Sequence, residues 1–240
     1  MPTADAESPP QPLAFDTLSV GPTGRLPAQA VLLIHGTGGN GPEQIQAHRS
    51  AAEAAASAAD LPVLLLAPTL EVPYHFLIPD LARRTIAALD LLREGGRIRP
   101  RVHLWGFSGG AHFAHRFALQ HPDQAARVVA LSAGEWTAPD GRHDGMMTRT
   151  DWFERPPFDG MPGLREAAAV PAAPGRAHLR WRVGCGDADT ADRQETAAWF
   201  ADALAADAEG GPVERLHWSG GHDHIPADVY ARSWAFLTAP

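Results

Sequence analysis

The residues best suited to chemistry are Gly106-Phe107-Ser108-Gly109-Gly110, which follow the pattern Gly-x-Ser-x-Gly. The apolar run Val102–Trp105 comes directly before them, and a helix-forming stretch, Ala111–His121, comes directly after. A serine on such a strand-to-helix turn is exposed at the tip of the bend, and its glycine neighbours let strand and helix approach closely. The amide of Gly109 would stand at a helix N-terminus, where it can stabilise an oxyanion. The pattern therefore predicts nucleophilic acyl-transfer chemistry at Ser108.

A nucleophilic serine needs a general base, and His222 is the candidate. It lies in the segment Ser219-Gly220-Gly221-His222-Asp223-His224, just past the last apolar run of the chain. Histidine side chains ordinarily titrate at about pH 6.5, which suits proton transfer at neutral pH. His224 is the alternative, and we favour His222 because the two glycines before it free the backbone to place its ring.

The base must in turn be oriented by a carboxylate, and in open α/β sheets such groups collect at the carboxyl ends of strands. The apolar run Leu179–Cys185 is followed at once by two candidates, Asp187 and Asp189. Asp189 fits a Gly-x-x-Asp turn counted from Gly186, and Asp187 fits the same turn counted from Gly184. We favour Asp189 and keep Asp187 as the alternative, since both could instead cap the helix expected next.

A second oxyanion donor is predicted in His35-Gly36-Thr37-Gly38-Gly39, where the amide of Thr37 would stand beside that of Gly109. The same stretch, continued to Gly41, also has the glycine spacing of a dinucleotide-binding turn. That interpretation requires an acidic residue at the end of the next strand, but that strand ends in Ala67-Pro68-Thr69, and no acidic residue follows until Glu71. A phosphate-binding loop would need Lys followed by Ser or Thr after Gly41, and these are missing too. We therefore expect no nucleotide cofactor.

The elements that must position these residues are visible as short apolar runs, each continuous enough to be buried on both faces of a parallel sheet. The runs are Ala30–Ile34, Val63–Ala67, Val102–Trp105, Val128–Ser132, Leu179–Cys185 and Val213–Trp218. Before them, the alternating pattern of Leu13–Val20 predicts an antiparallel edge strand. Helical patterns separate them at Pro42–Ala59, Ile78–Arg93, Gly110–Gln120, Asp192–Ala208 and Ala227–Leu237. This alternation predicts the α/β class, with a doubly wound, mostly parallel sheet.

One segment, Glu135–Gly175, breaks the alternation and is rich in Pro, Gly, Met and aromatic residues. A loop of this length inside a compact domain is usually functional, so we interpret 135–175 as a lid-like insertion, or cap, after the sixth strand. Residues 1–12 are expected to form a flexible tail, and 13–240 a single domain. The tail has neither the basic start nor the apolar stretch of a signal peptide.

Composition narrows the class of function further. The chain has 240 residues, 45% of them hydrophobic, and a formal net charge of −8. No cluster of Lys or Arg stands out, so nucleic acid and anionic membranes are not expected partners. No apolar run approaches the ~20 residues of a membrane span, and the single cysteine, Cys185, precludes an intrachain disulfide, so we expect a cytoplasmic protein. His222 and His224 could ligate a metal only with a third ligand that the sequence does not indicate, and no metal is expected.

The order of Ser108, then Asp189 or Asp187, then His222, with a His-Gly loop upstream, resembles that of the α/β-hydrolase fold family. The resemblance covers residues 13–238 and implies that fold, with a Ser-His-Asp triad and a cap. The loop that begins at His35 departs from the His-Gly-Gly-Gly form of the hormone-sensitive-lipase-like group, and the doubled aspartate leaves the acid open.

These features predict a serine hydrolase that cleaves a carboxylic ester or a related acyl compound, through an acyl-enzyme intermediate. The Met and aromatic side chains of the insertion suggest a small-molecule acyl substrate that is partly apolar. Three alternatives use the same scaffold. An acyltransferase would prefer an alcohol or thiol acceptor over water, a peptidase or amidase would cleave amides, and a binding protein would show no turnover.

Overall fold

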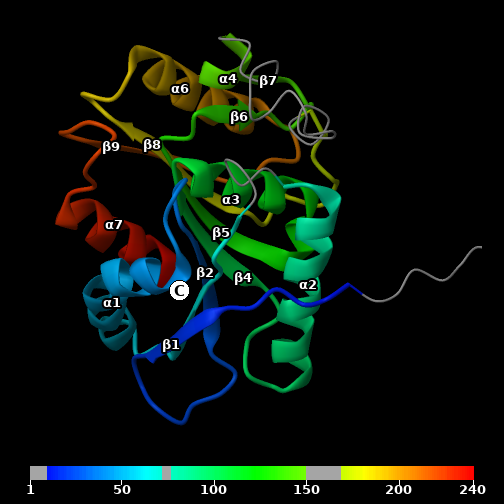
Figure 1. The fold of residues 1–240 in the computed structure, drawn as a ribbon, viewed down its shortest axis with the longest axis vertical. Helices are drawn as coiled ribbons and strands as arrows, with labels where there is room; N and C mark the ends of the chain where they lie inside the picture. Colours follow the sequence, from blue (N-terminus) through cyan, green and yellow to red (C-terminus); the bar gives the residue numbers. More distant parts are fainter. Residues whose placement is uncertain (1–9, 72–76, 150–168) are drawn as a thin grey trace, which may run out of the picture.

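The computed structural model describes residues 10–71, 77–149 and 169–240. Its centre is a seven-stranded sheet in the order β1-β3-β2-β4-β5-β8-β9 (Figure 1). All strand pairs are parallel except β1 with β3, which are antiparallel at one edge. The strands are β1 (Asp16–Val20), β2 (Gln29–Ile34), β3 (Val63–Ala67), β4 (Val102–Phe107), β5 (Ala125–Leu131), β8 (Arg180–Gly186) and β9 (Val213–Trp218). The doubly wound, mostly parallel α/β sheet is thus confirmed, including its antiparallel edge strand.

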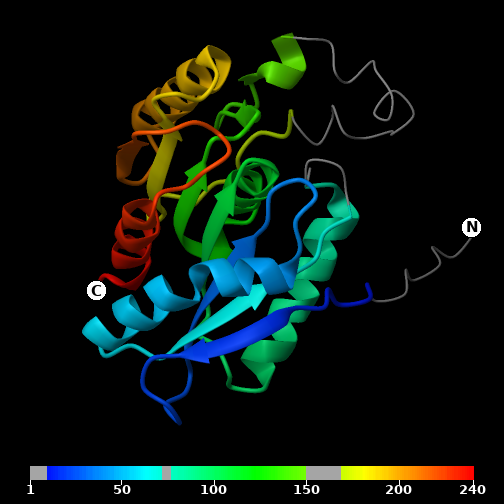
Figure 2. The ribbon, with the colours of Figure 1, turned by 60° about the vertical axis from the view of Figure 1, so that its left-hand side comes forward.

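Helices cover both faces of this sheet (Figure 2). The long helices are α1 (Gly41–Ala58), α2 (Pro79–Glu94), α3 (Gly109–Gln120), α6 (Ala191–Ala206) and α7 (Ala227–Thr238), and the short ones η2 (Pro122–Gln124) and α4 (Met146–Arg149). One apolar core joins the sheet to α2, α3 and α6, and the other joins it to α1 and α7. The two faces of the sheet are therefore buried against different helices.

The continuous apolar runs follow from this two-sided burial. In β2, Leu32 packs in the core shared with α2, α3 and α6, whereas Leu33 packs in the core shared with α1 and α7. The same alternation in β4 sends Leu104 to the first core and Trp105 to the second. Successive side chains of a strand point to opposite faces, so a strand covered on both sides has no polar alternation.

The segment after β5 requires one correction. We expected the insertion to follow the sixth strand, but only five strands precede it, and the sixth, β6 (Glu135–Thr137), lies inside it. There β6 pairs antiparallel with β7 (His143–Gly145) as a separate two-stranded sheet. The two strands are too short to produce an apolar run, so the pattern could not distinguish them from loop. Residues 150–168 of the expected lid lie outside the described residues.

The start of the insertion is tied to α3, the helix that follows Ser108. The ring of His112 on α3 accepts hydrogen bonds at Nε2 from the amides of Gly134 and Glu135, at 2.8 and 3.0 Å. Glu135 is fully buried, and its carboxylate accepts hydrogen bonds from the amide and hydroxyl of Thr148. The base of the insertion is therefore held in a fixed relation to the serine turn. No helix in the described parts of the chain has the length and apolar character needed to cross a bilayer.

Candidate active site

Ser108 stands on the turn between β4 and α3 in a strained conformation, with φ +54° and ψ −121°. Two neighbouring glycines permit this turn. A Cβ atom on Gly106 would lie 2.1 Å from the carbonyl oxygen of Gly110, and a Cβ on Gly110 would lie 2.1 Å from that of Ile34. Both distances are far below van der Waals contact, so strand, turn and helix can meet only with glycine at these positions.

His222 follows β9 and brings its ring to Ser108. Its Nε2 atom lies 3.0 Å from Ser108 Oγ, and its Nδ1 atom lies 3.0 Å from Asp189 Oδ2. An ionised carboxylate only accepts hydrogen bonds, so Nδ1–H donates to Asp189, and Nε2 is left to accept the hydroxyl proton of Ser108. The ring of Phe107 stacks on the imidazole, with centroids 4.8 Å apart, and limits its rotation. The three side chains form one hydrogen-bonded chain.

Asp189 is held in its ionised state although its side chain is buried. Burial alone would raise the pKa of this carboxyl, but hydrogen bonds from His222 and the Thr190 amide, with the nearby Arg193 charge, lower it to about 2. The Thr190 amide donates to Oδ1 at 2.8 Å, and Arg193 Nη1 lies 3.6 Å from the same oxygen. The Cys185 thiol contacts Oδ2 at 3.4 Å. These partners fix both carboxylate oxygens and leave the group charged at neutral pH.

The structure brings Asp189, and not Asp187, to the imidazole. Asp187 is exposed, and its carboxylate accepts a hydrogen bond from the amide of Gly220 at 2.9 Å. It therefore ties the turn after β8 to the start of the histidine loop. His224, the alternative base, is exposed two residues beyond His222.

The loop after β2 lies against Ser108. A Cβ on Gly36 would stand 3.7 Å from Ser108 Cβ. The turn that contains Thr37 is closed by a hydrogen bond from the amide of Gly39 to the carbonyl of Gly36, at 3.0 Å. On the other side of Ser108, Gly109 is the first residue of α3, and the helix itself makes no use of its N–H. The amides of Thr37 and Gly109 thus belong to the two segments that border Ser108.

Sequence reasoning missed the part that His35 plays in this loop. The buried ring accepts the amide proton of Leu70 at Nε2, at 2.8 Å, so its own proton is on Nδ1 and is donated to the carbonyl of Gly36, at 2.7 Å. Burial lowers the pKa of His35, which keeps the ring neutral. The imidazole therefore links the loop after β2 to the loop after β3. The dipeptide His35-Gly36 was the available signal, but Leu70 is 35 residues away in the chain.

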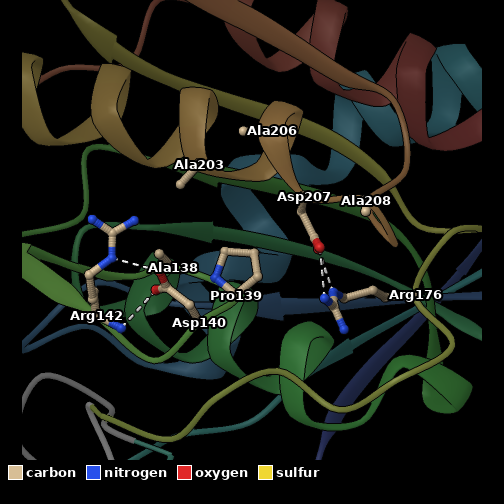
Figure 3. Close-up of a pocket in the computed structure, with 9 residues that line it drawn as sticks. All are labelled: Ala138, Pro139, Asp140, Arg142, Arg176, Ala203, Ala206, Asp207 and Ala208. Carbon is tan, nitrogen blue, oxygen red and sulfur yellow. Dashed lines mark hydrogen bonds and ion pairs between the residues drawn. The ribbon is translucent and has the colours of Figure 1, made fainter.

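A cavity of about 350 Å³ lies apart from these residues, between the β6–β7 turn and the C-terminal end of α6 (Figure 3). Its charged side chains are paired with each other. Arg176 makes two hydrogen bonds to Asp207, at 2.5 and 2.8 Å, and Arg142 binds Asp140 at 2.6 Å. None of the predicted site residues lines this cavity.

The chain has the α/β-hydrolase fold, as its sheet order, its helix layers and the serine turn after β4 indicate. Solved structures show the same fold. The chain resembles the fluorophosphonate-binding serine hydrolase FphF of Staphylococcus aureus, with a TM-score of 0.62 and 14% identity over 95% of this chain and 100% of that chain. It resembles a ferulic acid esterase with a TM-score of 0.60 and 14% identity, over 95% of both chains. It resembles a carboxylesterase from Mesorhizobium loti with a TM-score of 0.57 and 18% identity, over 95% of this chain and 96% of that chain.

No protein-family model and no curated protein matches the sequence. At these identities the solved structures establish the fold of the chain. The activity has to be argued from the site itself, because one fold carries many chemistries.

Proposed function

We propose that this protein is a serine hydrolase that cleaves a carboxylic ester of a small molecule. One observation carries the proposal: Ser108 Oγ, the His222 ring and the Asp189 carboxylate form a continuous chain with two contacts of 3.0 Å. A nucleophile in reach of a base, which is itself oriented by a buried carboxylate, is the arrangement that activates serine. The names of the structural neighbours, among them a serine hydrolase and a carboxylesterase, support the same chemistry.

In the proposed reaction, Ser108 Oγ attacks the ester carbonyl while His222 Nε2 takes the hydroxyl proton. The carbonyl oxygen becomes an oxyanion that accepts hydrogen bonds from the amides of Thr37 and Gly109, and each such donor contributes about 3–4 kcal/mol in a well-studied hydrolase. When the carbonyl re-forms, the bond to the leaving oxygen breaks, and His222 gives that oxygen its proton.

Water completes the cycle. His222 takes a proton from the water molecule as its oxygen attacks the acyl-enzyme, and returns that proton to Ser108 Oγ as the acid leaves. Throughout, the charge of Asp189 stabilises the imidazolium form of His222 and holds its tautomer. The net reaction converts an ester and water to an acid and an alcohol.

The test is turnover of 4-nitrophenyl acetate by wild type, Ser108→Ala and a matched serine variant, Ser132→Ala. Ser132 also has a positive φ, but it is fully buried and its hydroxyl contacts Cys185 Sγ, at 3.4 Å, and not the imidazole. We expect Ser108→Ala to lose about 10⁴-fold or more in kcat, because the residues of a triad act as a unit. Ser132→Ala should retain turnover. Undiminished turnover in Ser108→Ala would refute the proposal.

A further inference from the structure

A cavity of about 460 Å³ adjoins the proposed nucleophile on the α1 and α7 side of the sheet. Two of its lining residues, Gly36 and His222, border Ser108: a Cβ added to Gly36 would be 3.7 Å from Ser108 Cβ, and His222 Nε2 is 3.0 Å from Oγ. The cavity therefore lies beside the position that the ester group would occupy in the proposed reaction. Its volume is in the range of small-molecule sites.

The position of this cavity indicates which half of an ester it receives. In the proposed reaction His222 must pass its proton to the leaving oxygen, so the alcohol lies on the side of the imidazole. One wall of the cavity is His222 itself with the three residues that follow it, as far as Ile225. The leaving alcohol, attached to the oxygen that His222 protonates, extends along this wall.

Three aromatic side chains line the cavity, beside polar ones. Phe107 stacks on His222, and the rings of Trp105 and Tyr230 stack on each other with centroids 5.8 Å apart. Behind them the buried ring of His48 packs edge-on against Trp105, at 4.1 Å, and holds it in place. These preformed aromatic faces favour a flat ring, because aromatic surfaces gain both from burial and from ring–ring contact.

Two polar atoms in this lining have no hydrogen-bond partner among the residues that the structure describes. They are the side-chain oxygen Oε1 of Gln44, an acceptor, and the indole nitrogen Nε1 of Trp105, a donor. Trp105 is 1% exposed, so its N–H is shielded from bulk water. A shielded polar group without a partner is costly, and a hydroxyl is the smallest group that both accepts and donates a hydrogen bond.

We infer, on the basis of the proposed function, that this cavity binds the leaving alcohol of the ester and prefers an arylalkyl alcohol whose ring carries a hydroxyl. The ring would lie against the aromatic walls. The hydroxyl would accept a hydrogen bond from Trp105 Nε1 and donate one to Gln44 Oε1.

The experiment compares kcat/KM for acetates that differ only in the alcohol: ethyl, 2-phenylethyl and 2-(4-hydroxyphenyl)ethyl acetate. The reacting carbon and its neighbours are the same in all three, so differences report on binding of the distant ring. We expect 2-phenylethyl acetate to exceed ethyl acetate by about 10- to 100-fold, in line with the discrimination that apolar pockets achieve. The ring hydroxyl should add a further increase of about 5-fold, the value of one net hydrogen bond. Gln44→Leu should remove that last increase.

Two phenylalanine substitutions on α1 test whether the preference for the aryl alcohol arises in this cavity. Ala47 is exposed and lines the cavity, so Ala47→Phe should narrow it and lower the ratio of 2-phenylethyl to ethyl acetate by about 10-fold. Gln46 is the exposed neighbour that does not line the cavity, so Gln46→Phe should keep the wild-type ratio. Ethyl 3-phenylpropanoate, which carries its ring on the acyl side, should be unaffected relative to ethyl acetate in both variants.

The outcomes separate this inference from the proposed function. If wild type hydrolyses ethyl acetate through Ser108 but shows no preference for the aryl alcohols, the inference is wrong and the proposed function stands. If Ala47→Phe keeps the ratio, or if it discriminates against the acyl-side ring instead, the assignment of the cavity to the alcohol is overturned. If wild type hydrolyses no ester and Ser108 reacts with no phosphonate, the proposed function itself fails.

Discussion

The identity of the carboxylate that orients His222 can be tested with two substitutions of the same kind, two residues apart. Asp189→Asn and Asp187→Asn each replace a carboxylate by a carboxamide of nearly the same shape. Asp189 is buried and lies 3.0 Å from His222 Nδ1, whereas Asp187 is exposed and binds the amide of Gly220. We expect a large loss of kcat in Asp189→Asn and little change in Asp187→Asn.

The size of the expected loss of kcat follows from the group that His222 Nδ1 would face in Asp189→Asn. In Asp189→Asn, the amide nitrogen can take the place of Oδ2 and donate to Nδ1, which moves the ring proton to Nε2 and leaves no acceptor for the Ser108 hydroxyl. The charge that stabilises the imidazolium is lost at the same time. The corresponding change in a known serine protease lowers kcat about 10⁴-fold, which equals about 5.4 kcal/mol of transition-state stabilisation.

The assay is steady-state hydrolysis of 4-nitrophenyl acetate, with thermal unfolding of each variant measured in parallel to show that it is folded. Loss of kcat in a folded Asp189→Asn, with Asp187→Asn within about threefold of wild type, is the expected result. If Asp187→Asn lost as much kcat as Asp189→Asn, or if Asp189→Asn kept wild-type kcat, the assignment of the orienting acid would be wrong.

Two further predictions concern stability. A Cβ on Gly106 or Gly110 would stand 2.1 Å from a backbone carbonyl oxygen, so alanine at either position should lower the free energy of unfolding in urea by at least about 3 kcal/mol. In the control Gly95→Ala the nearest atom to the new Cβ is 3.4 Å away, and the loss should be no more than about 1 kcal/mol. Equal losses in all three variants would contradict the steric argument. Burial lowers the pKa of both His48 and His103 to about 3. In the unfolded chain these histidines bind protons at about pH 6.5, so the unfolded state binds more protons below that pH, and these two alone should lower the free energy of unfolding by about 2–3 kcal/mol between pH 7 and 5.5. A flat profile over this range would refute the prediction that the two rings stay neutral.

The main strands and the serine turn could be predicted because they depend on local sequence patterns. Continuous apolar runs predicted the parallel strands, since two-sided burial removes polar alternation, and the run before Ser108 together with the helix after it predicted the turn. The short strands β6 and β7 could not be predicted, because three residues are too few to show a period.

The details of the site depend on contacts between distant residues, which the sequence does not display. Asp187 and Asp189 both follow β8, and only the turn closed by the amide of Asp189 on the carbonyl of Gly186 determines which one faces the imidazole. The cavity beside His222 draws its walls from α1, β4 and the loop before α7. We expected an apolar pocket from the insertion, and that expectation stays a prediction, because much of the insertion lies outside the described residues.

Labelling with a fluorophosphonate probe tests the central claim, an activated serine at position 108, most directly. The probe phosphonylates serine only where a base and an oxyanion site activate it, and mass mapping identifies the modified residue. We expect one adduct, on Ser108, in wild type and in the control Ser132→Ala, and none in Ser108→Ala. A folded wild-type protein without an adduct, or with an adduct on another residue that persists in Ser108→Ala, would contradict the account.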